Sequence, residues 1–441
     1  MKILFSLQIT STLFVGKILK IVRDTIVITE VSIGAKFLPF LKIWGLIPAT
    51  IFCIFFVSLL LKRKSYKISY LTLSVIFGGI FIFYTWLLVP YSHTMNALRL
   101  AFILREFLPR CFEGVILIFE LWPITVFYVF SELWIIVMLT IMFWKYIGDI
   151  LTIEQGKEIF PLFSLDISGI LVGPLFFYLR WITNGQWFLQ CQLLNTVILI
   201  MIIFLVILMY VIQIQYPINT VLNANKQDID ELYPCNNLYL LSLAAVVFLF
   251  ELTDNLFDIF WKNLLGIYLS NPIDFSIYLA NTTTLTGVGG TLFIIFFSKY
   301  FLKNISWLIA SLVTPMIFSI TTSIFFLSFL FEIPLENIVF IGAIQTCLIS
   351  ISKQTLFDNT RDLAILAVPL KERYKIRKLS DALSSRLGKS AGNIIYQLFL
   401  ILELSLSNIF YVIILFFSGY LPIWIFSIKY LNSRYKKFIS N

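Results

Sequence analysis

Acidic and basic side chains lie within the long apolar stretches of this 441-residue chain. A charge near the centre of a bilayer costs roughly 2.5–3.5 kcal/mol on insertion scales, so it has to face a partner, an aqueous cavity or a substrate. The residues of this kind are Arg23, Asp24, Lys42, Glu132, Asp166, Arg180, Glu251, Asp254, Asp258, Arg386, Lys389 and Glu403. The mixture suits an anionic substrate that Lys and Arg hold and that acids release or gate. A proton relay is the alternative use of the acids.

Some of these charges are also explained by pairing that only fixes helix packing. Arg23 with Asp24, and Arg180 near the end of an apolar stretch, fit that explanation. Three other charges, each flanked by apolar residues, favour a functional role: Lys42, Glu132 and Lys389.

The stretch "RLGKSAGN", Arg386 to Asn393, contains the Gly-Lys-Ser of phosphate-binding loops. A P-loop needs G-x-x-x-x-G-K-[ST] between a strand and a helix, so that backbone N–H groups surround the phosphates. Leu383 stands where the first glycine should be, and the stretch opens an apolar helix. We therefore expect no nucleotide hydrolysis here. Lys389 remains as a point charge available to a phosphate, beside small residues that allow helices to approach closely.

The sequence lacks the residue patterns that metal binding, disulfide formation and triad catalysis require. The chain has one histidine, His93, and five scattered cysteines, so neither a metal site, a disulfide framework nor a Ser-His-Asp triad is predicted. We expect no cofactor, no catalytic residues and no enzyme activity. A membrane-bound transferase would need a catalytic cluster in a loop, and a structural or sensor protein would not need so many charges within the membrane. The net charge of +9 has no soluble basic domain to carry it, so nucleic-acid binding is not predicted.

The composition is that of an integral membrane protein. The chain is 59% hydrophobic and 13% charged, with a mean hydropathy of +0.93, whereas soluble domains carry about 25% charged residues. The apolar runs are continuous rather than alternating, which predicts all-α membrane spans and not barrel strands. The first 30 residues lack a small-residue cleavage site, so we expect them to form the first membrane helix.

Hydropathy predicts about twelve transmembrane helices in two groups of six. A polar stretch near the middle of the chain separates residues 1–215 from residues 237–441, with 216–236 as a linker. Two six-helix halves are the plan of major-facilitator-like transporters. The predicted spans lie near 4–29, 37–61, 68–91, 121–148, 161–183, 186–214, 237–261, 273–298, 303–330, 335–351, 386–405 and 406–429.

The cations indicate the orientation of these helices. If both termini are cytoplasmic, the inner segments collect most of the lysines and arginines, including the dense run from Lys371 to Lys378. Two interruptions, 92–114 and the basic cytoplasmic segment 352–384, read as amphipathic helices at the membrane surface.

Six ordered motifs resemble one family over nearly the whole chain. They are "RDTIVITEVSIGAKFLPFLKIWGLIP" from Arg23, "NALRLAFILREFLP" from Asn96, "FYVFSELWIIVMLTIMFWKYIGDI" from Phe127, "NLFDIFWKNLL" from Asn255, "SKQTLFDNTRDLA" from Ser352 and "RLGKSAGN" from Arg386. In these motifs the sequence resembles the nucleotide transporters, the ATP/ADP translocases of obligate intracellular bacteria, plastids and intracellular parasites. The resemblance implies a twelve-helix, major-facilitator-like fold.

The resemblance also implies which charges serve transport. It assigns nucleotide exchange to Lys42, Glu132, Asp258 and Lys389, and it places further residues in matching motifs: Arg23, Asn96, Arg99, Lys353, Arg361 and Arg386. The chain departs from the family pattern at Ser384, Ser385 and Ala391, which stand where glycines are usual, and at Asp258, which is shorter than the usual glutamate.

The function implied by the resemblance is ATP:ADP antiport by alternating access, which imports host ATP in exchange for ADP. Lys42 and Lys389, one from each half, would neutralise the phosphates, and Glu132 and Asp258 would gate or position the nucleotide. The expected location is the inner membrane of an intracellular bacterium or parasite. The alternative is import of other nucleotides, by counter-exchange or with protons.

Overall fold

The computed structural model describes most of the chain as helix. The residues that it describes are 2–88, 96–109, 112–150, 166–215, 237–304, 306–366, 368, 376, 378–402 and 418–434. Within these ranges there is no strand, as the continuous apolar runs predicted. The predicted linker 216–236 and Glu403 lie outside them.

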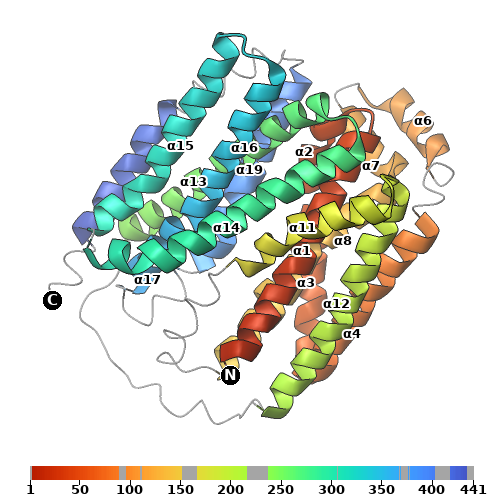
Figure 1. Cartoon of the computed structure of the whole chain (residues 1–441), viewed down its shortest axis with the longest axis horizontal. Coiled ribbons are helices and arrows are strands. Elements are labelled where there is room, and N and C mark those ends of the chain that lie inside the picture. The colour runs from red at the N-terminus through yellow and green to blue at the C-terminus, as the bar shows by residue number, and fades with distance from the viewer. Residues whose placement is uncertain are drawn as a thin grey trace. The chain divides into compact units, whose positions relative to one another are not determined.

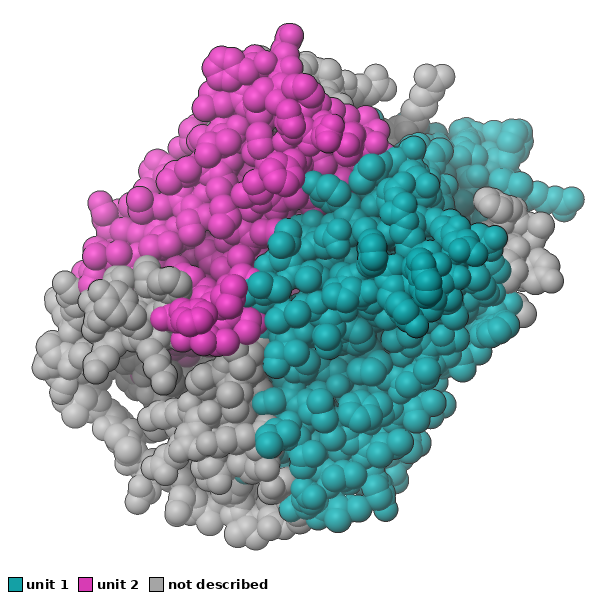
Figure 2. Space-filling view, viewed as in Figure 1, with its two compact units in different colours: residues 1–227, 269–288 teal, residues 228–268, 289–441 magenta. Residues whose placement is uncertain are grey.

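The chain divides into two compact units, which Figure 2 colours separately. The first unit comprises Met1–Gln227 and Leu269–Val288, and the second comprises Asp228–Tyr268 and Gly289–Asn441. One long helix, α14 (Pro272–Asn304), therefore contributes its first part to one unit and its remainder to the other. The boundaries of the two halves, at 215 and 237, stay a prediction.

The first unit is organised around α1 (Figure 1). This helix packs against the helices labelled α8, α11 and α12. Its most apolar window is 61% buried, because its apolar side chains point to neighbours on several sides. The elements of this unit are α1 (Lys2–Glu30), η1 (Gly34–Phe37), α2 (Leu38–Phe40), η2 (Leu41–Leu46), α3 (Ile47–Arg63), α4 (Tyr66–Phe83), η3 (Tyr84–Leu88), α6 (Leu98–Phe107), α7 (Glu113–Glu120), α8 (Trp122–Trp134), η5 (Ile135–Phe143), α9 (Trp144–Ile150), α11 (Ile167–Ile182) and α12 (Trp187–Gln215).

The second unit is built around α13, which is buried along most of its length. Its most apolar window is 72% buried, as expected of a helix that is surrounded by protein. It packs along α16 and α19, with Trp261 and Phe250 among its buried rings. The elements of this unit, besides the second part of α14, are α13 (Asn237–Tyr268), α15 (Trp307–Leu330), α16 (Leu335–Ser352), η7 (Lys353–Phe357), α17 (Asp358–Leu366), η8 (Lys378–Ser384), α19 (Ser385–Ile401) and a last helix over 418–434.

Nine helices in the described part of the chain are long and apolar enough to cross a membrane. A tenth apolar helix, Ile167–Ile182, is shorter. Each of the twelve predicted spans overlaps a helix in the described ranges, but the count of twelve stays a prediction.

The tenth predicted span is longer than the sequence indicated. We expected it to end near residue 351 and to be followed by a separate surface helix from 352. Instead α16 continues through the π-helical turn η7 into α17, so that one stretch runs from Leu335 to Ile365. Lys353 interrupts the apolar run at that point, but its charge is neutralised by a buried glutamate, and the helix can continue past it.

π-helical turns recur beside the charged residues that the sequence singled out. Lys42 lies in η2, Lys353 opens η7, and η5 begins three residues after Glu132. A π-helical turn widens the backbone by one residue and is frequent at functional sites, because it re-aims side chains within a helix.

Two glycines of "RLGKSAGN" let α19 pack closely on α13. A Cβ at Gly388 would lie 2.5 Å from the carbonyl oxygen of Phe248, and a Cβ at Gly392 would lie 3.1 Å from that of Leu252. The side chain of Asn255 also donates a hydrogen bond to the carbonyl of Lys389 (3.1 Å). The small residues therefore serve close helix approach, as the sequence indicated.

Substitution of Gly388 tests this packing. We expect Gly388→Ala to lower stability by about 1–3 kcal/mol, because the added methyl group overpacks a backbone contact that cannot move as a side chain would. The measurement is the thermal unfolding midpoint of the purified protein in detergent. The control is Gly79→Ala on α4, where a Cβ meets nothing within 4 Å and the midpoint should hold or rise. Equal losses for both variants would contradict the packing argument.

Candidate functional site

Within the described helices, three clusters centre on a buried charge and join different helices, two in the first unit and one in the second. Each cluster joins helices that are far apart in sequence. We describe each within its own unit.

The first cluster surrounds Arg23, whose side chain is only 6% exposed. Its guanidinium donates to Glu132 of α8 (2.6 Å) and to its neighbour Asp24 (3.3 Å). It also lies over the ring of Tyr128, with 4.9 Å from the guanidinium carbon to the ring centroid. A buried guanidinium with two carboxylates and an aromatic face is well compensated, so this cluster fixes α1 against α8. Glu132 keeps 26% of its side chain exposed.

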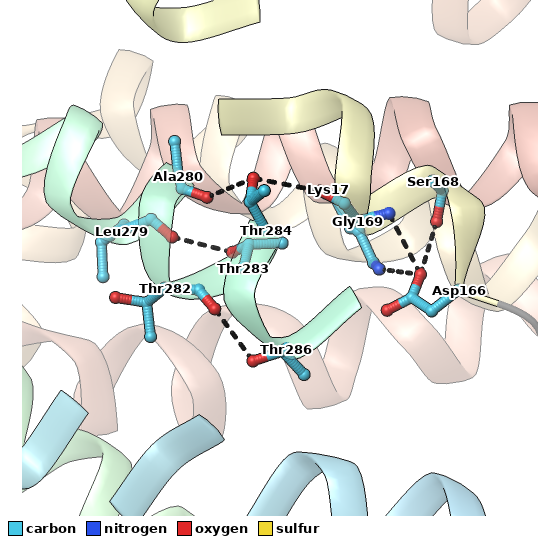
Figure 3. Close-up of polar contacts among 10 residues, drawn as sticks. All are labelled: Lys17, Asp166, Ser168, Gly169, Leu279, Ala280, Thr282, Thr283, Thr284 and Thr286. Atoms are coloured by element: carbon cyan, nitrogen blue, oxygen red, sulfur yellow. Dashed lines mark hydrogen bonds and ion pairs between the residues drawn. The ribbon is translucent and has the colours of Figure 1, made fainter. Parts of the chain in front are cut away.

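The second cluster lies where α11 begins (Figure 3). Asp166 caps the helix: its carboxylate accepts from the backbone N–H of Gly169 (3.1 Å) and from the Ser168 hydroxyl (2.9 Å), and it pairs with Lys17 of α1. The sequence placed Asp166 inside a span, and the structure places it at the helix N-cap. A carboxylate there satisfies free N–H groups and complements the positive end of the helix dipole.

Thr284 of α14 joins the same cluster by bonding to the backbone of α11 (Figure 3). Its hydroxyl donates to the carbonyl of Gly169 (3.2 Å) or of Ala280 (3.1 Å). It also accepts from the N–H of Gly173 (2.8 Å). In a regular α-helix the N–H of Gly173 would donate to the carbonyl of Gly169, and the residue after Gly173 is Pro174. The hydroxyl thus bonds to the backbone of α11 in the turn that directly precedes Pro174.

Glycines on both helices make this contact possible. A Cβ on Gly173 would collide with the Thr284 hydroxyl, and one on Gly169 would lie 2.9 Å from Lys17 Nζ. From the other side, a Cβ on Gly287 of α14 would lie 2.8 Å from the backbone nitrogen of Ile170. The first part of α14 therefore belongs to the first unit through close backbone packing as well as through hydrogen bonds.

The third cluster is in the second unit, where two lysines meet Glu251 of α13. Lys353 Nζ donates to one carboxylate oxygen (2.9 Å) and Lys389 Nζ lies 3.6 Å from the other. The Glu251 side chain is 7% exposed, that of Lys353 27% and that of Lys389 55%. The helices α13, α16 with η7, and α19 are thereby joined by one carboxylate. Its two partners differ in exposure, and Lys389 is the more exposed of the two.

Two further acids, Asp254 and Asp258, follow Glu251 at helical spacing on α13. Both are half-buried, and Asp258 accepts from Lys262 (2.7 Å). Two residues that the sequence predicted separately, Asp258 and Lys389, therefore lie on helices that pack together, α13 and α19.

The other sequence-predicted residues lie as follows. Lys42 is half-buried in η2, and Asn96 is half-buried just before α6. Arg361 pairs locally with Asp358 (2.9 Å) and Asp362 (3.3 Å). Arg99 on α6 and Arg386 on α19 are exposed.

Near Arg99, the amphipathic segment 92–114 contains α6, as a helix was expected there. Arg105 on α6 lies between two carboxylates, Glu113 (2.6 Å) and Glu120 (2.7 Å). The hydrogen bond to Glu113 and the charge of Glu120 raise the pKa of the Arg105 guanidinium above its ordinary value. A cavity of about 440 Å³ opens beside Arg105, whose charge is already matched by these two acids.

The sequence analysis missed the roles of Lys17 and Glu251. Lys17 lies in the middle of an apolar helix, a signal that could have been read as it was for Lys42. Glu251 was recognised as a buried charge, but its two partners are 102 and 138 residues further along the chain, and no local pattern connects them.

Known proteins resemble this chain over nearly its full length. A family model described as "TLC ATP/ADP transporter" matches residues 1–435. A protein named "ADP,ATP carrier protein 2" from Chlamydia pneumoniae is 26% identical over 461 residues, which cover 95% of this chain and 85% of that protein. "ADP,ATP carrier protein 4" of Rickettsia prowazekii is 26% identical and covers 97% and 90%. "ADP,ATP carrier protein 2, chloroplastic" of Arabidopsis thaliana is 25% identical and covers 97% and 73%.

Among solved structures, a D-xylose-proton symporter superposes with a TM-score of 0.58. The match has 12% identity and covers 97% of both chains. At that identity the likeness concerns the fold alone, and it confirms the predicted major-facilitator-like, all-helical architecture.

Loss of the Arg23 guanidinium should destabilise the first unit. Arg23→Met removes the buried guanidinium that pairs with Asp24 and Glu132, a loss of about 3–5 kcal/mol for a buried pair. The double variant Arg23→Met with Glu132→Gln should recover part of the loss, because it also removes the negative charge of one of the two carboxylates that paired with Arg23. Thermal unfolding in detergent measures both, with exposed Arg99→Met as the control. A single variant as stable as the control would refute the pairing.

Thr284→Val tests the bond between α14 and α11. The substitution keeps the volume but leaves the Gly173 N–H without its partner, so we expect a loss of about 1–3 kcal/mol. The matched control is Thr72→Val on α4, whose exposed hydroxyl bonds only within its own helix. Thermal unfolding compares the two, and no difference between them would show that the α11 contact contributes nothing.

Proposed function

Because this chain belongs to the TLC ATP/ADP transporter family, we propose that it is a secondary active transporter that exchanges ATP for ADP by alternating access. The observation that carries this proposal is the extent of the family match, which covers residues 1–435 and so includes all three charge clusters. The printed names of the relatives, all ADP,ATP carrier proteins, support the choice of substrates.

We further propose that Lys389 in the second unit and Lys42 in the first contact the nucleotide phosphates. An ammonium is a compact charge that suits phosphate oxygens without demanding one geometry. The exposure of Lys389 (55%), beside the buried carboxylate of Glu251, supports its role. Glu132 and Asp258 position or gate the nucleotide. The remaining members of the proposed set are Arg23, Asn96, Arg99, Lys353, Arg361 and Arg386.

In this proposal the protein imports external ATP in exchange for internal ADP, with both termini in the cytoplasm of an intracellular bacterium or parasite. The exchange carries about one extra negative charge inward, at a cost of about 2.3 kcal/mol per 100 mV of inside-negative potential. Since about 1.4 kcal/mol corresponds to a tenfold ratio, an ATP/ADP ratio about 40-fold higher outside offsets 100 mV.

Proteoliposomes loaded with ADP test the exchange. We expect uptake of labelled ATP into loaded vesicles and little into empty ones, because each inward step needs an outward substrate. ATP uptake that does not depend on internal ADP would rule out antiport. A panel of unlabelled nucleotides, with and without a protonophore, separates ATP:ADP exchange from import of other nucleotides by counter-exchange or with protons.

Lys389→Ala should abolish ATP uptake while leaving the protein folded. The side chain is exposed, and its Nζ lies 3.6 Å from the Glu251 carboxylate, which also pairs with Lys353. Its removal should therefore cost little stability. The control is Lys429→Ala, which removes an exposed lysine from the last helix. Normal uptake by Lys389→Ala, with an unchanged unfolding midpoint, would remove Lys389 from the site.

A further inference from the structure

Glu251 serves two lysines that it binds unequally. Lys353 is held twice: it donates to a carboxylate oxygen at 2.9 Å, and its ammonium lies 4.9 Å from the centroid of the Phe250 ring. Lys389 has only an ion pair of 3.6 Å, which is longer than a hydrogen bond, and its side chain is 55% exposed. One lysine is therefore fixed to Glu251 and the other is exchangeable.

Lys389 can pair with Glu251 or with a bound anion, and these two states differ little in free energy. When an anion takes Lys389, Glu251 keeps Lys353, so the buried carboxylate is not left without a cation. When the anion leaves, Glu251 is close enough to receive Lys389 again. A polyphosphate, with several charged oxygens, competes well for an ammonium that is paired only loosely.

The acids around the cluster sharpen this competition. Asp254 lies one turn after Glu251 and interacts electrostatically with both lysines, so Glu251 is not the only acid near them. An entering phosphate therefore meets lysines that already have acidic neighbours. It has to displace a carboxylate, and the carboxylate remains beside it.

We propose that Glu251 is the internal counter-anion of Lys389: it receives the lysine between nucleotides and competes with the phosphate for it, which speeds release. This inference rests on the proposed nucleotide exchange and assigns Glu251 as a positioning residue that acts through Lys389. The consequence is that loss of the carboxylate should strengthen nucleotide binding but slow turnover. Without the carboxylate the nucleotide binds more tightly and leaves more slowly.

Glu251→Gln is the direct test, with ADP as the probe. We expect the Kd for labelled ADP, measured on purified protein in detergent, to fall about fivefold, because a half-exposed ion pair is worth at most about that factor. In proteoliposomes the KM and the kcat of ATP uptake should fall together. Glu251→Asp, which keeps the charge, should recover part of the turnover. Glu336→Gln, an exposed acid in the first turn of α16, is the control and should leave Kd, KM and kcat unchanged.

Weaker or unchanged ADP binding by folded Glu251→Gln would overturn the inference. If that variant does not fold, Glu251→Asp keeps a carboxylate for Lys353 but shortens the side chain that reaches Lys389, and tighter ADP binding is expected of it to a smaller extent. Failure of the unsubstituted protein to bind ADP would instead defeat the proposed function, and the inference with it. Normal exchange by the unsubstituted protein alongside weaker ADP binding by the variants would defeat only the inference.

Discussion

A charge inside the bilayer has to be matched by another charge, and this constraint organises both units. Arg23 is enclosed by Asp24 and Glu132, and Glu251 by Lys353 and Lys389. Each match joins helices that are distant in sequence, so the pairs also decide which helices are neighbours. The glycines then set how closely those neighbours approach. A transporter cannot pair every charge completely, because a cation that is fully enclosed has nothing left for a substrate. Lys389 is the residue in which this balance is most visible.

The fold class could be predicted from the sequence because long apolar runs admit few structures in lipid. The sites could be predicted only in part. A charge within an apolar run is visible locally, and this marked Arg23, Glu132 and Glu251. Their partners are not visible locally, since Lys353 lies 102 residues after Glu251 and Asp166 lies 149 residues after Lys17. Lys353 also led us to end a helix that in fact continues, because the neutralising glutamate could not be identified from the sequence.

π-helical turns are a second feature that the sequence did not reveal. Their backbone widening depends on tertiary packing and has no reliable residue signature. Yet Lys42 and Lys353 both lie in such turns. The direction in which these ammonium groups point is therefore a property of the folded unit, and residue spacing at 3.6 per turn would place them on a different face.

The first part of α14 packs into the first unit although it follows α13 in the chain. This has a consequence for biosynthesis. The glycine face of α11 is complete by residue 182, but its covering residues, Thr284 and Gly287, emerge from the ribosome about a hundred residues later. During that interval α11, which contains Pro174, lacks the hydroxyl that bonds to its backbone. The first unit is thus completed only after α13, the first helix of the second unit, has been made.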